Sequence, residues 1–286
     1  MLGLNGDPET ALDAARELEY SRLDQDMKMQ ERLYKVAANA GLLFGQIDLA
    51  KKYIFGSEFS GDYERAIDLL RSALRKHGAL NAHKITRSLS GGKTLKELLA
   101  IKNSNMRDWD SKLLTAVNFS YGLTIPQNTK IAELLLRSEP DEWQYSPAAR
   151  YTLAQIIFSE DDPSAERVKE ALQELIITAN SGYVSGQVKL AELYELGLYV
   201  EKDFKKAALW YRIAGSKLPR IKVHLAKLIL EGKVAANYGE DALEILTRAA
   251  ENLDPTAIEA LVQYWAKEQN DGYDHERWMR RQKLLN

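Results

Sequence analysis

The stretch that decides the fold is Ala191–Gly215, AELYELGLYVEKDFKKAALWYRIAG, which reads as two short helices joined by a tight loop. Small residues recur along both helices at fixed distances. The alanine pairs that are separated by 16 residues are Ala191 and Ala207, Ala50 and Ala66, Ala116 and Ala132, and Ala226 and Ala242. Ala179, Ala214 and Ala249 follow one another at intervals of 35 residues. A fixed period in the thirties is typical of a helical repeat array.

The alanine spacing has a physical reason. Two antiparallel helices approach to about 8–10 Å only where their crossing points carry small side chains. One such pair cannot bury its apolar face alone, so neighbouring pairs must stack on it. Helix-period patterning runs nearly from end to end of the chain, without strand-like alternation. We therefore predict an all-α solenoid of about seven antiparallel helix pairs.

Glycine, proline and the quality of the repeat divide the chain into five segments. These are an N-terminal capping helix pair at 1–41, a repeat at 42–78, degenerate repeats at 79–145, three repeats at 146–254 and C-terminal capping helices at 255–286. The stretch SEPDEWQYSP at 138–147 contains two prolines, which favour a loop and make it the best candidate for a break or hinge.

The bulk composition excludes several kinds of chemistry and binding. The 286 residues carry a net charge of −2 and no cysteine, so disulfides, thiolate chemistry and a global attraction to nucleic acid are all excluded. No run approaches the roughly 18 apolar residues of a membrane span, and we expect no transmembrane segment. MLGLNGDPET lacks the features of a signal peptide. We expect a cytoplasmic protein if Met1 is the native start, and a periplasmic or outer-membrane-anchored one if the chain is a processed fragment.

The repeat skeleton resembles the Sel1-like repeat, a branch of the tetratricopeptide-like superfamily. The best copy carries Ala191, Tyr194, Gly197, Val200, Asp203, Ala207, Trp210, Tyr211 and Ala214; a second carries Ala50, Tyr53, Gly56, Asp62, Ala66, Ala73 and Gly78; a third carries Ala226, Gly232, Ala242, Ala249 and Ala250. The third copy departs from the pattern at Leu246, where tryptophan or tyrosine is usual. The resemblance implies a right-handed superhelix that binds proteins or assembles complexes, without a catalytic residue. Some bacterial members are scaffolds of exopolysaccharide export, and others act in signalling or host interaction.

No motif for catalysis, a cofactor or a metal is complete. Ser90–Thr94, SGGKT, is similar to the end of a P-loop, but Arg87 stands where that loop needs its first glycine and no strand precedes it. We interpret it as a loop between helices. The four histidines share no ligand spacing, and no serine lies in a nucleophile motif. We therefore predict no catalytic residue, no metal site and no cofactor.

Charge is segregated along the chain. Residues 71–107 hold nine cations and one acid, and residues 133–174 hold ten acids and four bases. One interpretation is that these are solvated helix faces. The other is a basic surface for an acidic protein or an anionic polysaccharide. Nucleic acid is disfavoured because the basic segment has few interleaved aromatic residues.

These patterns predict a non-catalytic scaffold that mediates protein–protein interaction or complex assembly through its concave surface. The candidate partner-binding residues are Arg75, Lys84, Arg87, Trp143 and Tyr145, chosen as basic or loop-aromatic side chains. One alternative is an envelope-associated scaffold for exopolysaccharide secretion. The alternative from another class is an enzyme or small-molecule sensor with a pocket in 79–145.

Overall fold

The computed structural model describes residues 7–18, 24–55, 62–77, 82–100, 106–138, 146–237, 239–267 and 273–283. Within these ranges the regular structure is helical throughout, and no strand is present. The chain divides into two compact units, Met1–Ser185 and Gly186–Asn286. The boundary falls inside one helix, α12 (Val184–Leu196).

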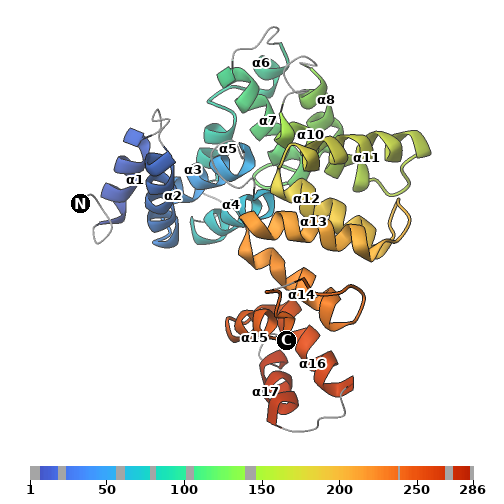
Figure 1. The fold of residues 1–286 in the computed structure, drawn as a ribbon. Helices are drawn as coiled ribbons and strands as arrows, with labels where there is room; N and C mark the ends of the chain where they lie inside the picture. The colour runs from blue at the N-terminus through green and yellow to red at the C-terminus, as the bar shows by residue number, and fades with distance from the viewer. Residues whose placement is uncertain are drawn as a thin grey trace. The chain divides into compact units, whose positions relative to one another are not determined.

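Both units consist of consecutive helices (Figure 1). The helices of the first unit are α1 (Pro8–Glu17), α2 (Asp24–Asn39), α3 (Leu43–Phe55), α4 (Tyr63–His77), α5 (Ala82–Leu89), α6 (Leu95–Ala100), α7 (Met106–Tyr121), α8 (Thr129–Arg137), α10 (Pro147–Phe158) and α11 (Ala165–Asn180). Then come α12 (Val184–Leu196), α13 (Phe204–Lys217), the 3-10 turn η3 (Pro219–Ile221), α14 (Lys222–Leu230), α15 (Ala242–Glu251), α16 (Pro255–Lys267) and α17 (Tyr273–Gln282).

Side-chain caps fix where many of these helices begin. Ser146 and Ser164 accept backbone N–H bonds at the starts of α10 and α11, and Asp203 does so at the start of α13. Each cap satisfies a donor that has no partner within its helix. At the end of α2, Gly41 adopts a φ of 80°, which is the left-handed conformation that glycine reaches without strain. The capping side chains and the glycine therefore set these helix boundaries.

Helix α10 is largely buried in the first unit. It packs against α3, α7, α8 and α11, and Figure 1 shows it beside α11. Its buried side chains point in every direction around the helix, among them Ala149, Tyr151, Leu153 and Ile156. A helix that is apolar all round is expected in such a central position.

Tyrosines from four separate places meet inside the first unit. The Tyr63 ring on α4 lies 5.0 Å from the Tyr151 ring on α10 and 5.9 Å from the Tyr121 ring at the end of α7. Tyr183, just before α12, lies 5.7 Å from Tyr151. Tyr63, Tyr151 and Tyr183 are between 0% and 4% exposed, and burial raises the pKa of Tyr63 and Tyr183 well above the usual value. We call these four side chains the tyrosine cluster.

Hydrogen bonds satisfy the hydroxyl groups of Tyr63 and Tyr183 in the tyrosine cluster. The Tyr63 hydroxyl lies 2.9 Å from Thr152 Oγ1, and the Tyr63 backbone N–H donates to Ser185 Oγ over 2.9 Å. The Tyr183 hydroxyl donates to the Ile54 carbonyl oxygen over 2.7 Å. Buried hydroxyls are costly without such partners. Helices α3 and α4 are therefore linked by hydrogen bonds to residues more than a hundred positions later in the chain.

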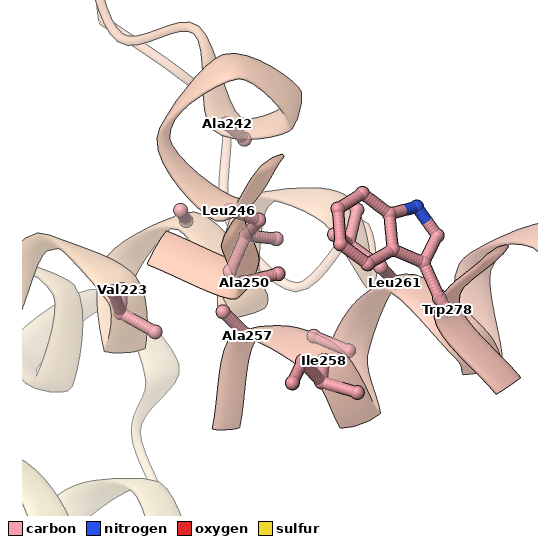
Figure 2. Close-up of a cluster of buried hydrophobic side chains, with 10 residues drawn as sticks. Val223, Ala242, Leu246, Ala250, Ala257, Ile258, Leu261 and Trp278 are labelled. Carbon is pink, nitrogen blue, oxygen red and sulfur yellow. The ribbon is translucent and has the colours of Figure 1, made fainter. Parts of the chain in front are cut away.

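The second unit has a continuous apolar core over α14–α17. Figure 2 shows this cluster, in which Leu246 and Ala250 of α15 face Ala257 and Leu261 of α16. Trp278 of α17 covers the end of the cluster and is 1% exposed. Arg277 and Arg281 lie over its ring at 4.5 and 5.3 Å. The aromatic side chain is buried while the flanking guanidinium groups stay near water.

The all-α prediction is confirmed for the described residues. The number of helix pairs and the handedness of the superhelix stay predictions. Within 79–145, α7 and α8 pack together as a full pair, whereas α6 spans only six residues. The proposed hinge stretch lies mostly in 139–145, outside the described residues.

Candidate partner-binding surface

The alanines of the repeat skeleton lie inside the helix pairs. Ala50, Ala66, Ala191, Ala207, Ala214 and Ala226 are each 0% exposed, and Ala242 is 7% exposed. Gly197 and Gly232 follow α12 and α14 with φ angles near 70°. Tyr53 is buried and Tyr194 is half-buried beneath Lys206 Nζ, 5.1 Å from its ring centre. These residues hold the pairs together and leave little of their surface to a partner; Gly56 and Gly78 lie outside the described residues.

The predicted basic residues are exposed and lie on two helices. Arg75 is on the last turn of α4, whereas Lys84 and Arg87 lie three residues apart on α5. Residues at this spacing share one helix face. Among the described residues, no carboxylate forms an ion pair with any of the three. The structure therefore presents these cations to solvent, while Trp143 and Tyr145 lie outside the described residues.

The acidic segment behaves differently, because its own arginines pair with its glutamates. Arg167 of α11 binds Glu133 of α8 at 2.7 Å and also contacts Glu160 and Glu170. Arg137 binds Glu133 at 2.7 Å and Glu170 at 2.6 Å. Hydrogen bonds to Glu133 and Glu160 raise the pKa of the Arg167 guanidinium, although burial acts against them. These charges link α8 to α11, so part of the negative segment is internally compensated, whereas Arg75, Lys84 and Arg87 form no ion pair with any described residue.

A hollow of about 420 Å³ lies beside the loop that joins α5 to α6. It is lined by Thr86, Arg87, Ser90, Gly92, Lys93, Thr94 and Thr124. The loop is the SGGKT stretch, and Gly91 and Gly92 adopt φ angles of 59° and 80°. Glu97 accepts from the Thr94 backbone N–H and hydroxyl, both at 2.7 Å, while Thr94 Oγ1 caps Glu97 N at 3.3 Å. The sequence predicted a loop here, and the structure adds an open, hydroxyl-lined hollow.

Sequence reasoning missed an apolar exposed loop in the second unit. Leu196, Leu198 and Tyr199 are 58%, 49% and 44% exposed at the end of α12. Tyr199 has a φ of 60°, an unusual conformation for a large side chain. Helical periodicity carries no information about side chains in a loop. The sequence signal for this exposed loop was its composition, because residues 196–199, LGLY, are apolar whereas turns usually carry polar residues.

Neither a metal site nor a membrane-spanning helix is found in the described part of the chain. No three histidine, aspartate or glutamate side chains gather there in a way that could hold a metal ion. None of the helices described is long and apolar enough to cross a bilayer.

Comparison with known sequences and folds identifies the repeats. A sequence profile of the Sel1 repeat matches residues 44–77 and 184–217, which are the α3–α4 and α12–α13 pairs. The chain carries Sel1 repeats. The matched ranges do not include the third copy predicted at 220–254, which stays a prediction. A search of curated proteins returns no match.

This chain is similar to several solved structures, including the two that follow. One is a protective antigen present in uropathogenic Escherichia coli strains and displaying an SLR fold, with 18% identity and a TM-score of 0.51. That match covers 98% of this chain but 62% of the antigen, so the Sel1 repeat chain spans less than two thirds of it. The other is a Sel1 repeat protein from Oxalobacter formigenes, with 18% identity, a TM-score of 0.46 and coverage of 99% and 84% of the two chains. At 18% identity, the similarity to the antigen is evidence for the fold alone.

Proposed function

We propose that this Sel1 repeat chain is a non-catalytic scaffold that binds an acidic protein partner through Arg75, Lys84 and Arg87. Sel1 repeats typically serve as protein-interaction scaffolds, which supports the general role. The observation that carries the proposal is the contrast in charge pairing. The three cations on α4 and α5 are exposed without an ion pair among the described residues, whereas Glu133 and Glu170 are held by arginines.

We expect the contact to use the concave surface of the stack, as helical repeat arrays do. The buried side chains of Tyr63 and Tyr183 are not available to a partner. The cations of α4 and α5 are available, because their side chains are exposed.

Charge reversal tests the proposal with a defined probe. The probe is a fluorescent peptide of alternating glutamate and aspartate, and a uronic-acid polysaccharide serves as the second arm. The variant combines Lys84→Glu with Arg87→Glu, and the control combines Lys205→Glu with Arg248→Glu, exposed sites in the second unit that change net charge equally. We expect the Kd for the peptide to rise about tenfold in the first variant, which corresponds to about 1.4 kcal/mol.

Two outcomes would overturn the assignment. An equal loss in both variants would show that only net charge matters. Binding of the polysaccharide but not of the peptide would favour the envelope-scaffold alternative. Circular dichroism of each variant would check that the helices are retained.

A further inference from the structure

We infer that the end of α12 and the loop that follows it bind an anionic lipid surface. The inference goes beyond the proposed protein-binding role, because it assigns a peripheral membrane contact to the second unit. It starts from Leu196, Leu198 and Tyr199, which are 58%, 49% and 44% exposed and which we call the apolar tip. Helix packing within the chain does not use these exposed surfaces, so they are available to an outside surface.

Backbone hydrogen bonds hold the apolar tip in place. The N–H groups of Gly197 and Leu198 both donate to the Leu193 carbonyl oxygen, over 2.9 and 3.2 Å. At the other end of the loop, the Asp203 N–H donates to the Tyr194 carbonyl oxygen over 2.9 Å. An apolar residue after a glycine of this kind commonly packs back against its helix, but Leu198 remains half exposed. A loop fixed in this way loses little conformational entropy when it binds.

Three exposed lysines from two loops and one helix lie beside the apolar tip. Lys202 belongs to the loop after α12 and Lys233 to the loop after α14, and their Nζ atoms lie 5.7 and 5.3 Å from the centre of the Phe204 ring. Lys205 is in the first turn of α13. Among the residues that the structure describes, no carboxylate forms an ion pair with any of the three. The ring attracts both ammonium groups and leaves their charge available.

Most of the carboxylates near these lysines already have partners. Asp203 accepts two backbone N–H groups at the start of α13 and lies 3.6 Å from Lys206 Nζ. Glu231 lies 4.0 Å from Lys227 Nζ. Glu201 is exposed within the loop and opposes an anionic surface. The three lysines described above, at +3, and Glu201, at −1, leave a net charge of +2 beside the apolar tip.

Apolar side chains beside unpaired lysines are the combination that an anionic lipid surface recognises. Leucine side chains enter the boundary between head groups and acyl chains, where tyrosine is also favoured. Lysines extend their aliphatic stems along this boundary and keep their ammonium groups among the phosphates. Each lysine near an anionic surface strengthens binding up to about fivefold. Stable peripheral attachment takes two such signals, and this loop region supplies both.

Cosedimentation of the full chain with lipid vesicles tests the inference. One set of vesicles is phosphatidylcholine alone, and the other contains about 30% phosphatidylserine to supply negative charge. We expect binding to the anionic vesicles and binding at least about tenfold weaker to the neutral ones. Leu196→Ser combined with Leu198→Ser should weaken binding to the anionic vesicles about tenfold, because less apolar surface is buried. Lys202→Gln combined with Lys233→Gln should weaken it by a similar factor.

Matched controls change the same residue types elsewhere in the second unit. Leu209→Ser combined with Leu253→Ser removes leucines that are 53% and 48% exposed. Lys267→Gln combined with Lys283→Gln removes two exposed cations. Both control variants should bind anionic vesicles as the unchanged chain does. Circular dichroism of every variant checks that the helices are retained.

Several results would overturn the inference. These are no binding to anionic vesicles, equal binding to both kinds of vesicle, or equal losses in the loop variants and their controls. Self-association that the two leucine substitutions in the apolar tip abolish, without vesicle binding, would identify a second copy of the chain as the occupant. Vesicle binding lost in Lys84→Glu with Arg87→Glu, but kept in the loop variants, would place the contact on α4 and α5 instead. Peptide binding in the earlier test depends on Lys84 and Arg87, so the two proposals fail separately.

Discussion

Replacing Asp110 with asparagine should stabilise the protein at neutral pH. Asp110 lies on α7, half-buried, near the Lys51 ammonium, which donates to Ser88 Oγ over 2.9 Å. Burial raises the pKa of Asp110 from 3.8 to about 6, although Lys51 acts in the opposite direction. Ionising this carboxyl group is therefore harder in the folded chain than in the unfolded one.

The sign and size follow from the two pKa values. Because the folded-state pKa is the higher one, the stabilising contribution of the protonated acid is fully present below pH 3.8 and is lost as the pH rises through about 6. The difference corresponds to about 3 kcal/mol at 1.36 kcal/mol per pKa unit. Solvent screening of a half-buried group reduces this to about 1.5 kcal/mol. Asp110→Asn should recover that amount at pH 7.5 and about half of it at pH 4.5.

Urea unfolding followed by circular dichroism at both pH values measures the effect. Asp68→Asn, on the exposed face of α4, is the control, since a surface change of this kind should stay within about 0.5 kcal/mol. Because other carboxyl groups titrate equally in both proteins, only the difference between them is compared. A gain from Asp110→Asn that is the same at the two pH values, or no gain at pH 7.5, would refute the reasoning.

Three further predictions concern the helix pairs. Ala191→Leu should cost about 1–3 kcal/mol in the free energy of unfolding, because the side chain has no space at the crossing point, whereas Leu209→Ala on the exposed face of α13 should change it little. Burial lowers the pKa of His224, so stability is complete above pH 6.5 and falls as the pH drops below it; His224→Phe should flatten this fall in a thermal melt measured from pH 7.5 to 5. Arg167→Met should cost about 1 kcal/mol at low salt and less in 1 M NaCl, where ion pairs such as that with Glu133 are screened, and equal losses at both salt concentrations would count against it.

The helix pairs were predictable because their cause is local and periodic. Ala191 and Ala207 recur at the spacing that a close helix crossing demands, and Asp203 lies where a helix must begin. The same reasoning located the ends of α12 and α14 at Gly197 and Gly232. A few residues of sequence are enough to recognise such signals, without knowledge of the tertiary structure.

The interior contacts and the hollow were not predictable in the same way. Tyr63 and Tyr183 come together across 120 positions of sequence, and nothing in a repeat period relates them. Arg87 and Lys93 were recognised as part of a basic segment, but the fact that both line one hollow together with Thr124 depends on the turn between α5 and α6. The partner-binding residues remain predictions, because charge alone does not specify which molecule they bind.

The bond from Tyr183 to Ile54 has a consequence for how this protein can be shortened or extended. In an ordinary repeat array each unit touches only its neighbours, so modules can be removed or duplicated almost independently. Here the N-terminal Sel1 repeat shares buried hydrogen bonds with residues 122 and 129 positions downstream. Deleting an intervening module would separate those ends, and a fragment that stops before Tyr183 would lack part of the first repeat's own interior. The first unit should therefore melt as a single cooperative block and tolerate indels poorly, despite being assembled from modular parts.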